Sequence, residues 1–372
     1  MLRDGFEDLF VLEMTNNHKG DLNRGLEIIS KFSRIVRFNN VKVAIKLQFR
    51  NIETFVHKDF QDRDDIYYIR RVLDTSLSVD EYAQLVEAVK KSGCIPLATA
   101  FDEKSVDLIE YFEMPFIKIA SSGCNDWMLI ERIAKTRKPA IISTGGVSSK
   151  DLDDIVIFFE RRNISLAINH CIAAYPTEDQ DLQLNQIDYL RNKYPKNVIG
   201  LSTHEYNDWD SSIIAAYAKG ARLFERHIDI DTDGVKIAPY SSLPYQIDVW
   251  FKAWHHAKKI CGASGESKIL PIKEEVDYLS SYIRGIYAKR DLNKGETLRE
   301  EDIYLAIPLQ KGQISTRELM LGQWGHKVIK PVGKDEPILI DTIDTPYAEN
   351  KELMKVIYHR GVEPNNPVKK KE

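Results

Sequence analysis

The 372-residue chain has little cysteine and no strong excess of charge of either sign. Its four cysteines (Cys94, Cys124, Cys171 and Cys261) are scattered, without the paired spacing of a zinc site or the density of a disulfide scaffold. The formal net charge is −4 and no basic block lies in the body of the sequence, which argues against nucleic acid or an anionic membrane surface as the main partner. We therefore expect an ordinary globular protein with reduced thiols.

Membrane spans and several common catalytic motifs are also missing. No stretch approaches the roughly 18 consecutive apolar residues of a transmembrane helix, and residues 1–10 carry acids where a secretion leader has a basic and then an apolar part. These two features predict a cytoplasmic protein without a membrane partner. The sequence lacks four common motifs: the phosphate loops GxGxxG and GxxxxGK(S/T), the zinc motif HExxH and the nucleophile motif GxSxG. It therefore gives no motif evidence for a dinucleotide-binding protein, a P-loop protein, a zincin or an α/β-hydrolase.

Short runs rich in Val, Ile, Leu and Phe recur along the chain, and each is followed by a longer amphipathic stretch. This alternation is typical of a parallel sheet covered by helices on both faces. Eight such units predict an α/β fold of the (β/α)8 TIM-barrel type, with an open doubly wound sheet as a minor alternative. The predicted strands are Phe10–Met14, Val43–Phe49, Ile95–Ala100, Phe116–Ala120, Pro139–Thr144, Leu166–Cys171, Val198–Ser202 and Arg222–His227.

The pattern changes after the last helix expected in the barrel. We predict a barrel domain over residues 1–265, a linker over 266–281, a small β-rich module over 282–345 and a C-terminal tail over 346–372. A module of about 65 residues is near the size at which an isolated core becomes marginal, so we expect it to pack against something. Its predicted strands are Arg284–Ala288, Lys327–Ile329 and Pro337–Ile340.

Polar side chains gather at the carboxyl ends of the predicted barrel strands, where this fold places its chemistry. In chain order they are Glu13, Asn17, Lys46, Gln48, Thr99, Lys118, Ser121, Ser143, His170, Tyr175, His204, Glu225 and His227.

Lys46 and Lys118 lie inside otherwise apolar strands, where an uncompensated ammonium group would be costly. Hydroxyl groups at neighbouring strand ends (Thr99, Ser121 and Ser143) favour a bound phosphate or carboxylate as their partner. The alternative is that each lysine pairs with a structural acid such as Glu13. The Gly145–Gly146 turn could add backbone N–H groups to an anion site.

His204 and His227 end the seventh and eighth predicted strands, which are neighbours in a barrel. Their imidazoles, beside Glu13 and Glu225, could share one divalent metal such as Mn²⁺ acting as a Lewis acid. The alternative is that each histidine is an ordinary hydrogen-bonded strand-end residue.

The motifs at these strand ends resemble those of the N-acetylneuraminate (sialic acid) synthase family, and the resemblance runs along nearly the whole chain. The segment after the barrel resembles the family's antifreeze-like SAF domain, with Arg284 and the Lys289–Glu296 segment (KRDLNKGE) in place. The barrel motifs, in family order, are Glu13–Gly20 (EMTNNHKG), Lys46–Phe49 (KLQF), Thr99–Asp102 (TAFD), Lys118–Ser121 (KIAS), Ser143–Gly145 (STG), His170–Thr177 (HCIAAYPT), Ser202–His204 (STH) and Glu225–His227 (ERH).

The resemblance implies an enzyme that condenses phosphoenolpyruvate with the aldehyde of an open-chain amino sugar, giving a 2-keto-3-deoxy sugar acid and inorganic phosphate. It implies Mn²⁺ as cofactor, with Mg²⁺ or Co²⁺ as alternatives, and a domain-swapped homodimer in which Arg284 reaches the partner's sugar. The implied site residues are Lys46, Thr99, Lys118, Ser121 and Ser143 for phosphoenolpyruvate, His204 and His227 for the metal, and Glu13, Asn17, Gln48, Tyr175, Glu225 and Arg284 for catalysis.

Several positions depart from the family pattern. Ser122–Gly123 replaces a Gly-Glu pair whose carboxylate contacts the reacting centre in the family, and Ala173 replaces a polar residue near the phosphate. Ala238–Pro239 stands in the region of an Asp-His pair, and Lys19 adds positive charge to the first motif. These changes favour a synthase for an altered aldose. Two alternatives stay open: a different aldolase or lyase reaction on the same barrel, and a ligand-binding protein without catalysis.

Overall fold

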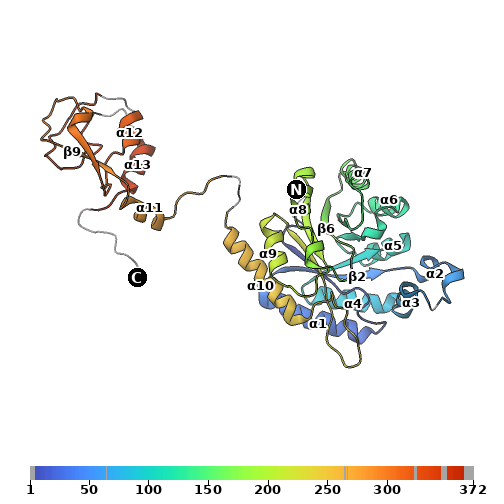
Figure 1. Ribbon diagram of the computed structural model, residues 1–372. Coiled ribbons are helices and arrows are strands. Elements are labelled where there is room, and N and C mark those ends of the chain that lie inside the picture. The colour runs from blue at the N-terminus through green and yellow to red at the C-terminus, as the bar shows by residue number, and fades with distance from the viewer. Residues whose placement is uncertain are drawn as a thin grey trace. The chain divides into compact units, whose positions relative to one another are not determined.

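The chain forms two compact units that meet in the sequence between Gly262 and Ala263. The computed structural model describes residues 5–363 except 64, 264, 266, 322–324 and 345–349. Figure 1 shows the first unit in blue to yellow and the second in orange to red. Among the described residues, no helix has both the length and the apolar character needed to cross a membrane.

The first unit is a closed barrel of eight strands in sequence order, with β8 hydrogen-bonded back to β1 and every pair parallel (Figure 1). The predicted (β/α)8 barrel is therefore confirmed, and each strand end lies within about one residue of the prediction. The strands are β1 (Leu9–Glu13), β2 (Lys42–Phe49), β3 (Ile95–Ala100), β4 (Ile117–Ile119), β5 (Ala140–Ser143), β6 (Leu166–Cys171), β7 (Val198–Thr203) and β8 (Leu223–His227).

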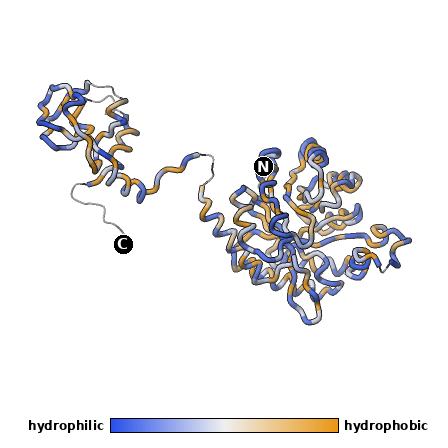
Figure 2. Tube along the Cα trace, viewed as in Figure 1, coloured by the Kyte–Doolittle hydropathy of each residue, from blue (hydrophilic) through white to orange (hydrophobic). Residues whose placement is uncertain are grey.

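Helices cover the outside of the barrel and bury the strands' outward side chains. Phe10 of β1 packs its ring against Trp250, Phe251 and Trp254 of α10, with ring centroids 4.8–5.3 Å apart. Figure 2 shows apolar and polar residues alternating along these helices, as expected for helices with one buried face. The covering helices are α1 (Leu22–Asn39), α4 (Val79–Lys91), α5 (Glu103–Tyr111), α6 (Trp127–Lys135), α7 (Ser149–Glu160), α8 (Gln186–Lys193), α9 (Ser211–Ala218) and α10 (Pro244–Cys261).

Two long connections follow the carboxyl ends of β2 and β8. The first contains α2 (Ile52–Phe55), η1 (Lys58–Phe60) and α3 (Tyr67–Asp74), and it projects from one side of the barrel (Figure 1). The second connects β8 to α10 over residues 228–243. Both connections contribute side chains to the cavity described below.

The second unit contains a two-stranded antiparallel sheet of β9 (Gly285–Ala288) and β10 (Ile303–Ala306). β10 was not predicted, and Lys327–Ile329 and Pro337–Ile340 form only isolated bridges within the described chain, so their prediction as strands was wrong. A small apolar core includes Ile286 of β9 and Ile338. Much of the backbone around it forms loops joined by single bridges and not continuous strand pairs. The remaining elements are α11 (Lys273–Ser280), η4 (Glu300–Asp302), α12 (Thr316–Leu321) and α13 (Lys351–His359); α11 lies in the predicted linker and α13 in the predicted tail.

Candidate active site

A cavity of about 1180 Å³ opens at the carboxyl ends of the barrel strands. Twelve of the thirteen site residues predicted from the sequence line it: Glu13, Asn17, Lys46, Gln48, Thr99, Lys118, Ser121, Ser143, Tyr175, His204, Glu225 and His227. The thirteenth, Arg284, immediately precedes β9 in the second unit.

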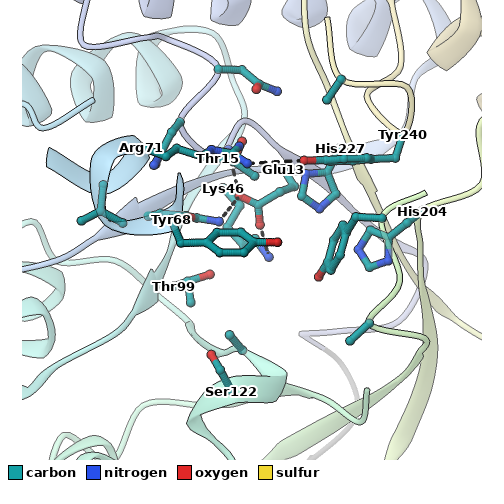
Figure 3. Close-up of a pocket in the computed structure, with 18 of the residues that line it drawn as sticks. Glu13, Thr15, Lys46, Tyr68, Arg71, Thr99, Ser122, His204, His227 and Tyr240 are labelled. Carbon is teal, nitrogen blue, oxygen red and sulfur yellow. Dashed lines mark hydrogen bonds and ion pairs between the residues drawn. The ribbon is translucent and has the colours of Figure 1, made fainter. Parts of the chain in front are cut away.

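Two lysines and two glutamates form a buried cluster at the floor of this cavity, and Figure 3 labels Glu13 and Lys46 of this cluster. The Lys46 ammonium group forms ion pairs with Glu13 and Glu225, and its Nζ lies 2.8 Å from Glu225 Oε1. Lys118 Nζ lies 3.6 Å from the other oxygen, Glu225 Oε2, and also donates to Ser143 Oγ. The lysines therefore have structural acids as partners and at the same time face the cavity.

Burial and ion pairing shift the ionisation of this cluster in opposite directions. Burial lowers the pKa of Lys46 to about 8, although Glu225 opposes that change. Burial alone would raise the pKa of Glu225, but Lys118 and Lys46 hold it below its usual range. The pairing with the lysines therefore favours the charged form of Glu225 although it is buried.

Hydroxyl groups surround the cluster, and a close backbone approach fixes one of them. The backbone N–H of Gly145 donates to Ser121 Oγ at 3.0 Å, so this group of the predicted glycine turn already has a partner. A Cβ at Gly145 would lie 2.8 Å from Ala173 Cβ and 3.0 Å from Ser121 Oγ. Position 145 therefore needs glycine because the segments that follow β4, β5 and β6 approach one another so closely there.

His204 and His227 lie side by side at the ends of β7 and β8, with ring centroids 5.1 Å apart (Figure 3). His204 Nδ1 lies 2.9 Å from the Ile172 carbonyl oxygen. Because a carbonyl can only accept, Nδ1 carries the proton and Nε2 keeps its lone pair. Burial lowers the pKa of His204 to about 4 and lowers that of His227 as well, so both rings are neutral.

Neutral imidazoles with a free lone pair are the form that binds metals, and a hydrogen bond to the other ring nitrogen is the usual way to orient such a ligand. His227 Nδ1 is buried without a hydrogen-bond partner among the described residues. Within that part of the chain, no third His, Cys, Asp or Glu completes a three-ligand group. The pair therefore fits a divalent ion that keeps its other positions for water or substrate.

Asn17 and Gln48 face the cavity but also hold other groups in place. Asn17 Nδ2 donates to the Ile228 carbonyl oxygen at 2.7 Å and to Ser241 Oγ at 3.3 Å, which connects the β1 loop to the β8–α10 connection. Gln48 Nε2 lies 3.4 Å from Glu13 Oε1. Asn17 therefore holds two walls of the cavity together, and Gln48 helps to position Glu13.

The residues that the two long connections bring to the cavity were not predicted from the sequence. Tyr67, Tyr68 and Arg71 come from α3, and Lys236 and Tyr240 come from the β8–α10 connection. None of these residues lies at a strand end, so no sequence signal marked them.

Arg50, the first residue after β2, also lines the cavity and was not predicted either. Unlike the residues of the long connections, it stands at a strand end, where a sequence signal could have been read.

Gly123, one of the positions singled out in the sequence, does not line the cavity. A Cβ at Gly123 would lie 3.4 Å from Ile119 Cγ2 and 3.7 Å from Leu129 Cδ2, both apolar. Its neighbour Ser122 lines the cavity instead (Figure 3). Glu13 and Glu225 are the only carboxylate side chains among the lining residues that the structure describes.

Comparisons with known proteins agree over both units. The NeuB family matches residues 40–264, and the SAF domain matches residues 283–344. The chain is 31% identical to an N-acetylneuraminate-9-phosphate synthase of Drosophila melanogaster, over 72% of this chain and 76% of that protein. It is 27% identical to a pseudaminic acid synthase of Campylobacter jejuni, over 86% and 93% of the two chains. A solved structure of a putative spore coat polysaccharide biosynthesis protein E from Chromobacterium violaceum is 36% identical, with a TM-score of 0.87, and the match covers 91% of this chain and 100% of that one.

Proposed function

Because the chain belongs to the NeuB family, we propose that it condenses phosphoenolpyruvate with the aldehyde of an open-chain amino sugar or related aldose. The products are a 2-keto-3-deoxy sugar acid and inorganic phosphate. The enol carbon C3 forms the new C–C bond with the aldehyde carbon, and water adds to C2. Loss of phosphate from C2 by C–O cleavage then leaves the keto group.

One observation supports this proposal above the others: Lys46 and Lys118 meet at the floor of the cavity among three hydroxyl-bearing side chains, Thr99, Ser121 and Ser143. A small molecule with a phosphate and a carboxylate needs two cationic points and several hydroxyl donors in a dry site. We assign these five residues to phosphoenolpyruvate. Its anionic groups compete with Glu13 and Glu225 for the two lysines.

We assign proton transfer to Glu13 and Tyr175. Glu225 contacts both lysines and accepts from Ser202 Oγ at 3.0 Å, which makes it a poor base. Among the described residues Glu13 forms an ion pair with Lys46 alone, and it accepts from Thr15 N–H at 2.9 Å, so it is the better acceptor for the proton that the attacking water loses. Burial raises the pKa of Tyr175, so its hydroxyl stays protonated and can donate to the aldehyde oxygen.

His204 and His227 would hold a divalent metal, for which we propose Mn²⁺. When bound, such an ion supplies Lewis-acid polarisation of the aldehyde. His204 donates from Nδ1 to the Ile172 carbonyl oxygen, so its Nε2 lone pair is free to bind a metal before any ion is present.

We also propose that Arg284 contacts the sugar from the partner subunit of a domain-swapped homodimer. Two inactive variants test this: Arg284→Ala and Lys118→Met. If Arg284 acts on the partner's cavity, unfolding and refolding the two variants together should restore about a quarter of the sites in a random dimer mixture. If Arg284 acts within its own chain, or if the chain is monomeric, the mixture stays inactive.

The reaction itself is tested by phosphate release from phosphoenolpyruvate with Mn²⁺ and a panel of aldoses. The panel contains N-acetylmannosamine, its 6-phosphate, deoxy-amino sugars and plain aldoses, and mass spectrometry identifies the product. Sugar-dependent phosphate release with equimolar 2-keto-3-deoxy acid supports the proposal. Lys118→Met is the matched loss-of-function control, and Lys104→Met, on the exposed part of α5, controls for loss of one surface lysine.

Two results would contradict the proposal in different ways. A C–C bond formed without phosphate release would indicate an aldolase or lyase reaction on the same barrel. Binding of phosphoenolpyruvate without turnover of any sugar would indicate a ligand-binding protein, with Gly123 as the position where a family carboxylate is missing.

A further inference from the structure

Four cationic side chains line the cavity outside its buried floor: Lys19, Arg50, Arg71 and Lys236. The two carboxylates that line the cavity, Glu13 and Glu225, are already paired with the floor lysines. None of the four cations has a carboxylate oxygen within ion-pair distance in the described chain. The walls of the cavity therefore hold four positive charges without an ion-pair partner among the described residues.

Arg71 comes from α3 and lies at the cavity (Figure 3), and its charge acts to lower the pKa of both Lys19 and Arg50. Its Nη1 lies 3.5 Å from Tyr240 Oη, and Tyr67 is a second hydrogen-bond partner, which leaves several of its five N–H donors for a ligand. The pKa of Lys19 is lowered by burial and by Arg71 and Arg24, while Asp229 opposes that change. Like charges gathered in one cavity repel each other, and a bound anion removes that cost.

Arg50 is held by two neighbouring side chains. Its guanidinium group stacks on Phe101, 3.7 Å from the ring centroid, and donates to Gln48 Oε1 at 2.8 Å. Gln48 in turn contacts Glu13, so Arg50 belongs to the part of the cavity assigned to phosphoenolpyruvate. Arg71, Lys19 and Lys236 remain for the second substrate.

The charge balance of the cavity also indicates that some cationic side chains are left over for the second substrate. Phosphoenolpyruvate carries a carboxylate and a phosphate, together about −2.5 to −3 at neutral pH because the second phosphate pKa is near 6. The lining side chains carry six positive and two negative charges, so a positive excess remains after this substrate is bound. A neutral sugar would leave that excess in a partly desolvated cavity.

We propose that Arg71, together with Lys19 and Lys236, binds an anionic group on the acceptor sugar, so that the substrate class is a sugar phosphate or a sugar acid rather than a neutral amino sugar. This inference rests on the proposed function, since it names the class of the aldehyde substrate. A planar guanidinium group can form two parallel hydrogen bonds with either a phosphate or a carboxylate, so both kinds of anionic sugar fit Arg71.

Initial-rate kinetics with three matched acceptors test the inference: N-acetylmannosamine, its 6-phosphate and its 6-carboxylate (the uronate). We expect kcat/KM to be at least about tenfold higher for one anionic acceptor than for the neutral sugar. The better of the two anionic acceptors identifies phosphate or carboxylate as the recognised group. The variant Arg71→Gln should lower kcat/KM for that acceptor at least about tenfold, with little change for the neutral sugar or in KM for phosphoenolpyruvate.

Arg70→Gln is the matched control, because Arg70 is the neighbouring residue of α3, pairs with Asp74 and does not line the cavity. Its kinetics should equal those of the wild type. Equal or better use of the neutral sugar overturns the inference and leaves the proposed function standing. A loss in Arg71→Gln that appears only in KM for phosphoenolpyruvate also overturns it.

A binding measurement keeps the test independent of turnover. Calorimetric titration of wild type and Arg71→Gln with the three sugars reports anion recognition even if the proposed reaction fails. Tighter binding of an anionic sugar that is lost in Arg71→Gln supports the inference. Equal binding of charged and neutral sugars by both proteins contradicts it.

Discussion

Lys46 and Glu225 pair across an intervening strand: Lys46 Nζ lies 2.8 Å from Glu225 Oε1, although β2 and β8 are each hydrogen-bonded to β1 and not to each other. Glu13, on β1 between them, contacts the same ammonium group. One lysine thus pairs with an acid on the neighbouring strand β1 and with an acid on β8, one strand further away, at the floor of the cavity. Its removal affects stability as well as ligand binding.

The substitution Lys46→Met should lower the free energy of unfolding by about 3–5 kcal/mol, because it leaves the buried Glu13 carboxylate without an ion-pair partner among the described residues. The double variant Lys46→Met with Glu13→Gln should recover a large part of this loss without recovering phosphoenolpyruvate binding, because it removes the unpaired carboxylate and keeps the Lys118–Glu225 pair. Urea denaturation of the three proteins gives the comparison. A single variant as stable as the wild type would show that Lys46 does not stabilise the buried Glu13 carboxylate.

Phosphoenolpyruvate capture should weaken in mildly alkaline solution. Burial lowers the pKa of Lys46 to about 8, so its charged form, which binds the anion, is complete below that pH and is lost as the pH rises through it. The value of kcat/KM for phosphoenolpyruvate should therefore fall above about pH 8, by about tenfold per pH unit. A profile that stays flat to about pH 10 contradicts the assignment of Lys46.

Metal content should depend on His204. The variant His204→Gln should lower the affinity for Mn²⁺ at least about tenfold, measured by elemental analysis after dialysis, because one of two imidazole ligands is lost. His170→Gln is the control, since His170 is also a buried strand-end histidine but contacts the Leu182 carbonyl and does not line the cavity. Unchanged metal content in His204→Gln would refute the metal assignment.

The two glycines after β5 should respond differently to alanine. At Gly145 a methyl group would press on Ala173 and Ser121, so Gly145→Ala should raise KM for phosphoenolpyruvate. Gly146 has φ +71° and open space around it, so Gly146→Ala should cost about 1 kcal/mol of backbone strain and leave KM unchanged. Thermal unfolding and initial rates separate the two effects, and equal KM changes would contradict the close-packing account.

The barrel and its floor were predictable because both follow a simple rule. Buried parallel strands are continuous apolar runs, and the polar residue that ends each run faces the active end of the barrel. Lys46 and Lys118 stand out for this reason, as charges inside apolar strands. The same rule predicts that His204 and His227 are neighbours, because the seventh and eighth strands of a closed barrel lie side by side.

The cavity walls were not predictable in this way. Arg71 and Tyr240 are 169 positions apart and meet through tertiary packing, with no local pattern that marks either one. The strands of the second unit were hard to predict for a related reason. Much of its backbone makes single bridges, such as Val328 with Ile343, in place of continuous strand pairs. Short apolar runs there indicate burial but not strand pairing.

The depth of the cavity has a consequence for the order in which two substrates are loaded. Lys118 and Thr99, at the floor, are at most 2% exposed, whereas Tyr68 and Lys236 stand at the exposed mouth. A sugar held at the mouth blocks the route to the floor, so the smaller molecule must enter first. Initial-rate and product-inhibition patterns should therefore be those of a compulsory-order mechanism in which phosphoenolpyruvate binds first. The sugar acid, which extends toward the mouth, should leave before the phosphate at the floor.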